Sequence, residues 1–246
     1  MPLVKTVLNP IQLVTNYKRF GINGIGNSSG GGNITARFSG GFNLNAGNSA
    51  TSYAKVAFSS SFATVTGATG QPVNFALGVG FFGIGYFNLG TATAGQAIRV
   101  ILGDDAESVV PFNSTQNALG TRGFGFEIYN DAGTKKIRLF AHDGTTYSTS
   151  AGVSGFQFAF TYTIQFYVKN DSAGNVYLYL AQNATENGLV PALPATPTIT
   201  LAGGPTSSTS AKRFVTVNVI TDGVNNPGSA FASYCALDES IFTVGI

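Results

Sequence analysis

The sequence is poor in charged residues. Its 246 residues include 13 Lys and Arg and 11 Asp and Glu, 10% of the chain, whereas soluble domains usually contain roughly 25%. The basic residues are scattered, with runs no longer than pairs such as Lys135-Lys136, which argues against nucleic acid binding. Because free soluble proteins generally keep charge on their surface, we expect this surface to be covered by other copies of the chain or by partners.

Cysteine and histidine are almost absent, and tryptophan is absent. Cys235 is the only cysteine and His142 the only histidine, so an internal disulfide and a zinc site with the usual Cys and His ligands are excluded. We expect no metal ion and no cofactor. Asp143 and Gly144 follow His142, and we predict that this histidine is exposed in a turn, with ligand contact as the alternative.

Long apolar runs are also missing. No stretch approaches 18 uninterrupted apolar residues, the length typical of a membrane-spanning helix. The segment from Met1 to Pro10 has no continuous apolar region and no small-residue cleavage site, so we predict that it is not a secretion signal. We therefore expect synthesis in the cytoplasm and no membrane partner.

Glycine and aromatic residues are abundant, with 32 Gly, 20 Phe and 10 Tyr. Apolar and polar residues alternate along the chain, and no window of helical length shows the spacing of an amphipathic helix. The clearest alternation spans 162–168 and 176–180, joined by the polar segment 169–175. A second spans 124–128 and 137–141, joined by 130–134. Both patterns predict antiparallel hairpins with one apolar face.

Six further segments are predicted as strands: 54–62, 73–87, 97–102, 155–160, 214–220 and 232–244. This number of strands predicts an all-β fold, a two-layer antiparallel β-sandwich of the jelly-roll type. Within 78–87 glycine alternates with large apolar residues, and we expect these glycines to face bulky rings of a neighbouring layer. Gly78, Gly80 and Gly83 match a dinucleotide-binding fingerprint, but strand rather than helix is predicted after them, so no phosphate site is expected.

We predict one main domain with appendages. Residues 1–50 are predicted to form an N-terminal arm and a loop rich in Gly, Asn and Ser, and residues 51–246 to form the sandwich. The segment 184–211 is rich in Pro and Gly. We interpret it as a long excursion from the sheet edge that contacts a neighbouring molecule, with a solvated crossover as the alternative.

The arm carries the apolar residues that we expect to act in assembly. It is predicted to add a strand to the sheet edge of a neighbouring molecule. The alternative is that the arm completes its own sandwich. The residues concerned are Leu3, Val4, Val7, Leu8, Ile11, Leu13 and Val14.

The only acidic cluster contains Asp104, Asp105 and Glu107. Its carboxylates, helped by backbone carbonyls, are of the kind that binds calcium, but the spacing of an EF-hand is lacking. A solvated loop is therefore the favoured interpretation. The candidate ligand loops of this chain comprise Asp104, Asp105, Glu107, His142, Asp143 and Tyr147.

The strand patterns of 123–131, 136–144, 162–168 and 176–180, with a closing strand at 236–244, resemble those of the concanavalin A-like jelly-roll family, which includes laminin G-type domains. The resemblance covers roughly residues 50–246. The family contains sugar-binding proteins, glycoside hydrolases and non-enzymatic scaffolds, so the resemblance implies the fold and leaves function to the site.

The resemblance disfavours hydrolysis. Laminarinase-like members carry E-x-D-x-x-E on a strand, where two carboxylates flank the glycosidic bond. Glu127 matches the first position here, but Tyr129 stands in place of Asp and Ala132 in place of the second Glu. We therefore predict that the protein is not an enzyme.

Similar jelly rolls occur among the structural proteins of tailed bacteriophages. Our first hypothesis is therefore a non-enzymatic virion structural protein, a capsid cement or decoration protein that binds other copies of itself and a major capsid or tail protein, with the virion as its location. The alternative is a lectin-like carbohydrate-binding module for adhesion or receptor binding, with a glycan as its partner. Sugar-binding members present Asp, Asn and an aromatic platform with calcium, and Asp104, Asp105 and Tyr147 are candidates for that role.

Overall fold

The computed structural model describes residues 75–89, 97–103, 122–184 and 191–207 in full, together with Leu44 and the backbone of the strands outside these ranges. The elements are β1 (Gly24–Ser29), β2 (Asn33–Ala36), β3 (Phe42–Asn45), β4 (Tyr53–Phe58), β5 (Gln71–Val73), η1 (Phe75–Leu77), β6 (Gly80–Asn88), β7 (Gln96–Gly103), β8 (Gly123–Asp131), β9 (Thr134–His142), β10 (Tyr147–Thr149), β11 (Tyr162–Asn170), β12 (Val176–Ala184), β13 (Ile199–Leu201), β14 (Thr209–Thr221) and β15 (Ser229–Asp238).

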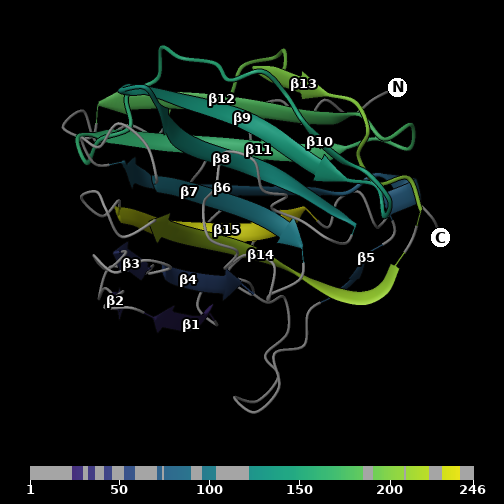
Figure 1. Ribbon diagram of the computed structural model, residues 1–246, viewed down its shortest axis with the longest axis horizontal. Helices are drawn as coiled ribbons and strands as arrows, with labels where there is room; N and C mark the ends of the chain where they lie inside the picture. Colours follow the sequence, from purple (N-terminus) through teal and green to yellow (C-terminus); the bar gives the residue numbers. More distant parts are fainter. Residues whose placement is uncertain are drawn as a thin grey trace.

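The strands form two antiparallel sheets that pack face to face. Among the described residues, the first sheet, called sheet A, has the order β1-β4-β14-β7-β8-β9-β10, with β5 also paired to β14. Sheet B has the order β13-β12-β11-β6-β15-β3-β2. In Figure 1 the strands of both sheets run across the view, from β13 and β10 near the top to β2 and β1 at the bottom. The predicted all-β, two-layer antiparallel sandwich is therefore confirmed.

The core lies between the sheets and is rich in phenylalanine. Alternate residues of β6, β8 and β11 point inward, and six phenylalanine rings from these strands and η1 meet there. The ring centroids of Phe126 and Phe166 lie 5.0 Å apart, and those of Phe81 and Phe124 lie 5.7 Å apart. Phe81, Phe124, Phe126 and Phe166 are completely buried. This interdigitation of rings from both sheets explains why the chain needs neither a disulfide nor a helix to form its core.

Both predicted hairpins are confirmed, each with a shorter turn than expected; the first loop spans 171–175 instead of the predicted 169–175. β11 and β12 pair from Tyr162↔Ala184 to Asn170↔Val176. β8 and β9 pair up to Asp131↔Thr134, so the turn contains only Ala132 and Gly133 instead of the predicted 130–134. Both turn residues have positive φ, 48° and 86°, as a type I′ turn requires. The mirror-image turn lets the strands continue with their normal twist up to the tip.

Two strand predictions are wrong in part or in full. The segment 73–87 is interrupted by η1, where the backbone N–H of Gly78 donates to the carbonyl of Phe75. The segment 155–160 is not a strand: residues 155–158 form no regular element, and Phe158 is buried in the core. The alternation of its aromatic residues reflects packing of an irregular segment and not pairing in a sheet.

The predicted division at residue 50 also differs from the structure. β1, β2 and β3 belong to the two sheets, so the sandwich includes strands from the region assigned to the arm and its loop. The segment 184–211 is in part an edge strand, because β13 pairs with β12 and buries Ile199 and Leu201. The side chain of Cys235 and residues 239–244 of the predicted last strand lie outside the described residues.

Gly80 of β6 has a large aromatic neighbour, as predicted, but this ring comes from the same sheet. A Cβ on Gly80 would lie 2.7 Å from the hydroxyl oxygen of Tyr167, which belongs to the adjacent strand β11. On the inner face, Gly83 is the register partner of Phe166. The missing side chain of Gly80 therefore makes room for a ring of the neighbouring strand, whereas the prediction expected rings of the other layer.

Candidate functional site

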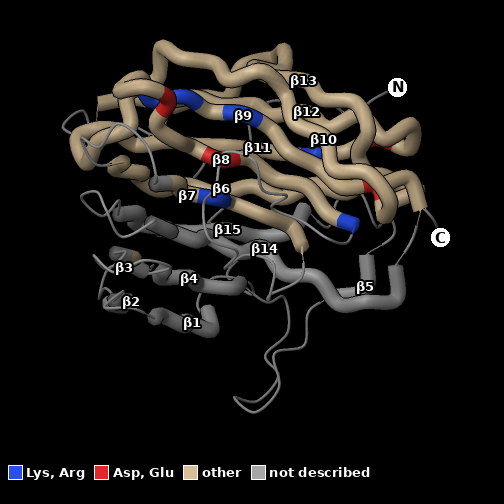
Figure 2. The backbone as a smooth tube through the Cα atoms, in the orientation of Figure 1, with Lys and Arg blue, Asp and Glu red and all other residues tan. Residues whose placement is uncertain are grey.

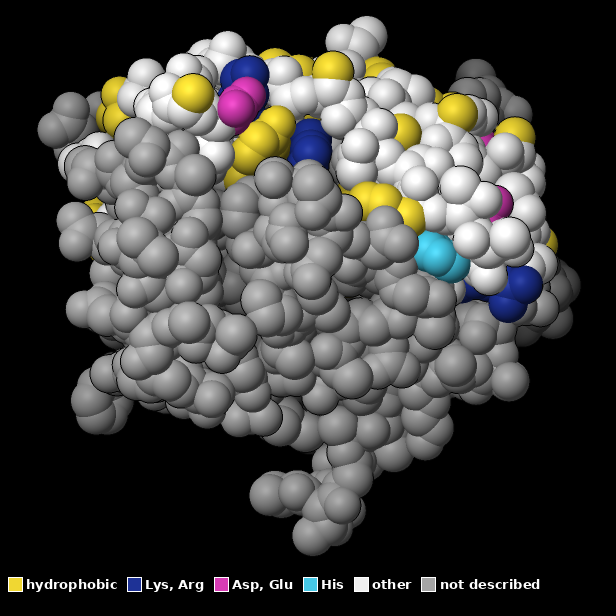
Figure 3. Space-filling model, viewed as in Figure 1, with side chains coloured by type: hydrophobic (Ala, Val, Ile, Leu, Met, Phe, Trp, Pro, Cys, Tyr) yellow, Lys and Arg dark blue, Asp and Glu magenta, His cyan; other side chains and the backbone are white. Residues whose placement is uncertain are grey.

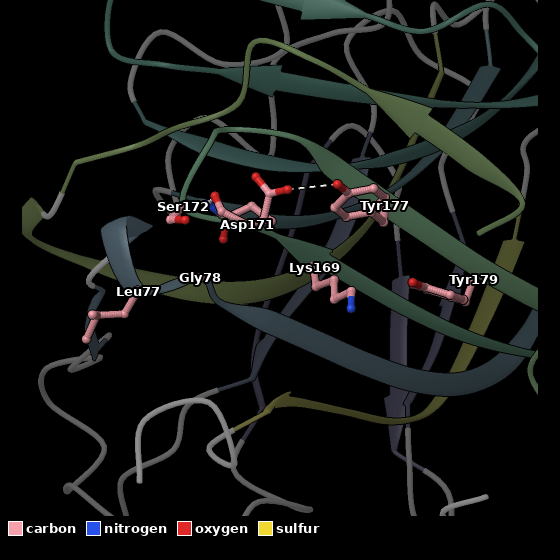
Figure 4. Close-up of a pocket in the computed structure, with 8 residues that line it drawn as sticks. Leu77, Gly78, Lys169, Asp171, Ser172, Tyr177 and Tyr179 are labelled. Carbon is pink, nitrogen blue, oxygen red and sulfur yellow. Dashed lines mark hydrogen bonds between the residues drawn. The ribbon is translucent and has the colours of Figure 1, made fainter. Parts of the chain in front are cut away.

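A pocket of about 440 Å³ lies at one end of sheet B, beside the β11–β12 hairpin. Its size is within the range of small-molecule sites. Figure 4 shows the side chains of Lys169, Tyr177 and Tyr179 along adjacent strands of the sheet, with Leu77 on the far side of Asp171 and Ser172. The residues that line it are Leu77, Gly78, Lys169, Asn170, Asp171, Ser172, Tyr177 and Tyr179.

Strand alternation places these side chains on one face. Val176, Leu178 and Leu180 of β12 point into the core, so Tyr177 and Tyr179 between them point outward and lie half-buried. The same alternation directs Lys169 outward, next to the core residue Val168. The prediction placed Tyr177 and Tyr179 together on the mixed face of the hairpin but did not identify them as a site. The sequence feature that could have identified the site is the presence of tyrosine at successive outward positions of one strand.

Lys169 is held between tyrosine rings. Its ammonium nitrogen lies 5.8 Å from the ring centroid of Tyr177 and 5.5 Å from that of Tyr179. The ring of Tyr179 in turn lies 5.9 Å from that of Tyr167, at an interplanar angle of 33°. Cation–π contacts attract the ammonium group but do not neutralise its charge. The rings therefore position a cation on this face.

Asp171 organises the hairpin loop. Its Oδ1 accepts the backbone N–H groups of Ala173 and Asn175, both at 2.9 Å, and its Oδ2 accepts the Asn175 amide and the Tyr177 hydroxyl. Burial acts to raise the pKa of Asp171, but these hydrogen bonds outweigh it and the pKa is lowered. The hydrogen bond to Asp171 raises the pKa of Tyr177. The carboxylate thus remains ionised and fixes the position of the Tyr177 ring.

Asn170 ties the pocket to the rest of the molecule. It is 3% exposed, and its Oδ1 accepts the backbone N–H of Val79 at 2.7 Å. Its Nδ2 donates to the carbonyls of Phe75 and Pro205, at 3.2 and 2.8 Å. One amide therefore joins the hairpin to η1 and to the segment after β13. Asn170 also begins a glycosylation sequon, but a buried amide with these partners is not accessible in the folded chain.

The outer face of sheet A carries a different charged group, the Glu127 cluster, formed by Arg99, Glu127 and Arg138. These residues are register partners on β7, β8 and β9. Arg99 Nε donates to Glu127 Oε2 at 3.0 Å, and Arg138 donates to Oε1. Glu127 and Arg99 are buried. Figure 2 shows these charges side by side on β7, β8 and β9.

Both oxygens of Glu127 are thus engaged by guanidinium groups. Burial acts to lower the pKa of Arg138, but the adjacent Glu127 carboxylate outweighs it and the pKa is raised. An acid catalyst must carry a proton, and a nucleophile must reach its substrate. Glu127 is a paired, buried carboxylate, which argues further against a catalytic role in glycoside hydrolysis.

The structure describes one of the two predicted ligand loops, between β9 and β10. His142 is 6% exposed, so the prediction of an exposed turn histidine is wrong. It is the last residue of β9, and its Nδ1 accepts the backbone N–H of Gly144 at 3.0 Å. Asp143 Oδ1 accepts the backbone N–H groups of Thr145 and Thr146, which lower the pKa of this aspartate. The loop is therefore organised by its own hydrogen bonds.

Tyr147 packs against sheet A. Its ring stacks on Phe140, with centroids 6.4 Å apart, and it contacts a small cluster with Ile101. Tyr147 lies half-buried. The second predicted loop, with Asp104, Asp105 and Glu107, lies outside the described residues, as do the arm residues Leu3, Val4, Val7, Leu8, Ile11, Leu13 and Val14. Within the described ranges, no three His, Cys, Asp or Glu side chains gather in a metal-binding arrangement.

Uncharged side chains predominate on the visible described surface. In Figure 3 white atoms, which belong to the backbone and to side chains that are neither charged, hydrophobic nor His, cover most of this area, with few Lys, Arg, Asp or Glu side chains between them. Two large apolar side chains of the described ranges are exposed, Leu77 at 61% and Phe160 at 51%. No helix among the described residues has the length and apolar character needed to cross a bilayer.

Comparison with known proteins identifies the type of fold. No protein family and no curated sequence matches the chain. The structure is similar to lectin UEA-II complexed with galactose, with a TM-score of 0.52 and 8% identity over 89% of this chain and 96% of that chain. A legume lectin-like domain from Entamoeba histolytica gives a TM-score of 0.48 with 12% identity, over 87% of this chain and 89% of that one.

The binding domain of botulinum neurotoxin DC in complex with SialylT gives a TM-score of 0.44 with 11% identity, over 91% of this chain and 46% of that one. Only the first similarity is strong enough to support an argument, and at 8% identity it supports the fold alone. The fold is that of the lectin-like β-sandwiches. The resemblance to concanavalin A-like domains noted in the sequence is confirmed at this level.

Proposed function

We propose that this chain is a non-enzymatic carbohydrate-binding module and that the pocket beside the β11–β12 hairpin is its ligand site. The observation that carries the proposal is the pair of outward tyrosines that line this pocket, Tyr177 and Tyr179, with Lys169 between them. The ring of Tyr167 packs against that of Tyr179 beside the pocket. Aromatic rings offer flat apolar faces with polar edges. A sugar ring has the same combination of apolar C–H faces and polar hydroxyls.

The rigidity of the site supports the proposal. Tyr177 is hydrogen-bonded to Asp171 at 2.7 Å, and the loop that carries Asp171 is closed by its own backbone and side-chain hydrogen bonds. Asn170 anchors the same hairpin to η1. A ligand that binds to preformed rings loses less free energy to the ordering of side chains. The lectin-like fold raises the expectation of sugar binding by analogy.

The loop from His142 to Tyr147 is the competing location for a sugar. Its histidine is buried and its tyrosine stacks on Phe140, so it presents less free aromatic surface than the hairpin pocket. That the acidic loop at 104–107 forms a sugar site together with the 142–147 loop stays a prediction.

The test is a glycan array with the full chain, followed by titration calorimetry with the best ligand. Tyr179→Ala removes a ring from the pocket, and Tyr147→Ala is the matched control in the other sheet. We expect Tyr179→Ala to weaken binding about tenfold, because ring contacts of this kind contribute roughly 1 kcal/mol or more. Tyr147→Ala should change affinity less than twofold. The opposite result would move the site to the 142–147 loop, and absence of any glycan binding would reject the function.

Location in a virus particle is a second proposal, with binding to other copies of the chain and to a major capsid or tail protein. It is supported by the low charge of the sequence and by the few charged side chains on the described surface in Figure 3, because such a surface suits contact with neighbouring molecules. A virion adhesion module would combine both proposals. A fixed copy number relative to the shell protein in purified particles is expected, and loss of attachment after deletion of residues 2–20 would implicate the arm.

A further inference from the structure

Lys169 provides the only positive charge among the residues that line the hairpin pocket. Among the described residues, no carboxylate lies within 4.0 Å of its ammonium nitrogen. The ion pairs between described residues involve Arg99, Lys136 and Arg138. Its described partners are the rings of Tyr177 and Tyr179. The ammonium group is therefore oriented by uncharged rings and not by a carboxylate.

The pocket also contains one carboxylate, Asp171, but its oxygens are already occupied. Four hydrogen bonds from Ala173, Asn175 and Tyr177 converge on it. These donors stabilise the negative charge locally, and Asp171 makes no ion pair with Lys169. A ligand anion at Lys169 thus does not have to displace a protein carboxylate.

The neighbours of Lys169 define what kind of anion fits. Tyr177 and Tyr179 are two residues apart on β12, so their Cα atoms are spaced by about 7 Å along the strand, and Lys169 lies between the two side chains in Figure 4. A small inorganic anion would use the ammonium group and leave the rings without contact. A sugar ring that bears a carboxylate uses both, because its C–H face covers a tyrosine while the carboxylate reaches the lysine.

We infer that the hairpin pocket selects acidic sugars, with Lys169 binding the carboxylate and Tyr177 and Tyr179 contacting the sugar ring. The inference rests on the proposed carbohydrate-binding function and names the ligand class of the same site. Lys169 acts here as a specificity-determining residue. The tyrosines contribute affinity for any sugar, and the lysine contributes the preference for the charged one.

The test compares ligands that differ only in charge. An array presents uronate- and sialate-terminated oligosaccharides beside the same oligosaccharides with the carboxylate methyl-esterified, and affinities of the best pair are measured in solution at low salt. We expect the acid form to bind about fivefold to tenfold more tightly, as a charge-assisted hydrogen bond at a half-exposed site allows. The preference should shrink at 0.5 M NaCl, because salt screens exposed charges.

Three variants assign the preference to Lys169. Lys169→Met should remove the preference for the acid form and leave binding of the ester within about twofold, whereas Lys169→Arg should retain much of the preference. Lys136→Met removes the same charge from the β8–β9 hairpin and should leave both affinities unchanged. Thermal unfolding of each variant verifies that the fold is retained.

The outcomes separate this inference from the function on which it rests. Equal binding of acid and ester by the native chain, or a preference that survives in Lys169→Met, overturns the inference and leaves sugar binding intact. Binding of sodium acetate as tightly as the acidic sugar also overturns it, since the rings would then play no part. Absence of binding to every glycan rejects the function together with the inference.

Discussion

The outer faces of the two sheets hold their charged residues in different ways. On sheet A, Glu127 lies between Arg99 and Arg138 and accepts hydrogen bonds from both. On sheet B, Lys169 contacts the rings of Tyr177 and Tyr179. Glu127 and Arg99 are buried, whereas Lys169 is half-buried beside a pocket. A buried charge needs opposite charge close by, but a charge that water reaches can remain unmatched and can serve a ligand.

Glu127→Gln should cause the largest loss in the free energy of unfolding, because it acts on the buried charges of sheet A. The substitution leaves Arg99 buried without its carboxylate, and breaking a buried ion pair in this way costs about 3–5 kcal/mol. Urea unfolding at pH 7 measures the loss. Asp131→Asn is the matched control on the same hairpin, because the pair of Asp131 with Lys136 is exposed and should contribute little to stability. Equal effects of the two substitutions would contradict the structural role assigned to the Glu127 cluster.

Asn170→Ala should have the next largest effect. It leaves the backbone groups of Phe75, Val79 and Pro205 without their partner, and a buried unsatisfied polar group costs about 1–3 kcal/mol. We expect a loss of about 3 kcal/mol in urea unfolding, nearly independent of salt because no ion pair is broken. Asn183→Ala, at a half-buried position of β12, should change stability by less than about 0.5 kcal/mol. A small effect of Asn170→Ala would show that the hairpin is not anchored through this amide.

Asp171→Asn should have a smaller effect on stability, and this effect should depend on pH. The pKa of Asp171 is lowered in the folded chain, below the unfolded value of about 3.9. Its contribution to stability is therefore present above the unfolded pKa and is lost as the pH falls through the folded pKa. We expect the native chain to be about 1 kcal/mol more stable than the variant at pH 6, with the difference shrinking towards pH 2. A difference that stays constant between pH 6 and pH 2 would show that the Asp171 charge does not stabilise the loop.

Lys169→Met should have the smallest effect on stability. The substitution removes only the contacts of the ammonium group with two rings. Exposed cation–π contacts contribute roughly 0.5–1 kcal/mol, and the apolar side chain of Met replaces part of this. We expect a change within about 0.5 kcal/mol in the same urea experiment. A loss above about 2 kcal/mol would mean that Lys169 stabilises the fold and that its charge is not held for a ligand.

Parts of both charged groups were predictable from the sequence. Alternation along 162–168 and 176–180 placed Tyr177 and Tyr179 on one face, and the pairing of 124–128 with 137–141 placed Glu127 and Arg138 on neighbouring strands. The third member of the Glu127 cluster was not predictable, because Arg99 is separated from Glu127 by 28 residues and no pattern in the sequence shows which strand pairs with β8 on its other side.

The pocket itself depended on more distant contacts. Asn170 was predicted as part of a hairpin loop, but its partners lie up to 95 residues away, at η1 and at the segment after β13. His142 was predicted in a turn because Asp143 and Gly144 follow it. Its burial depends on the packing around the end of β9, which a local motif does not encode.

The sequence by itself determined that this chain is an all-β sandwich with two well-defined hairpins and with aromatic residues on both faces of its strands, because alternation and turn composition are local properties. Only the tertiary structure decided which charges are paired and which remains beside a pocket. That decision depends on strand order and on the close approach of segments far apart in the chain, and both are set by how the two sheets pack together.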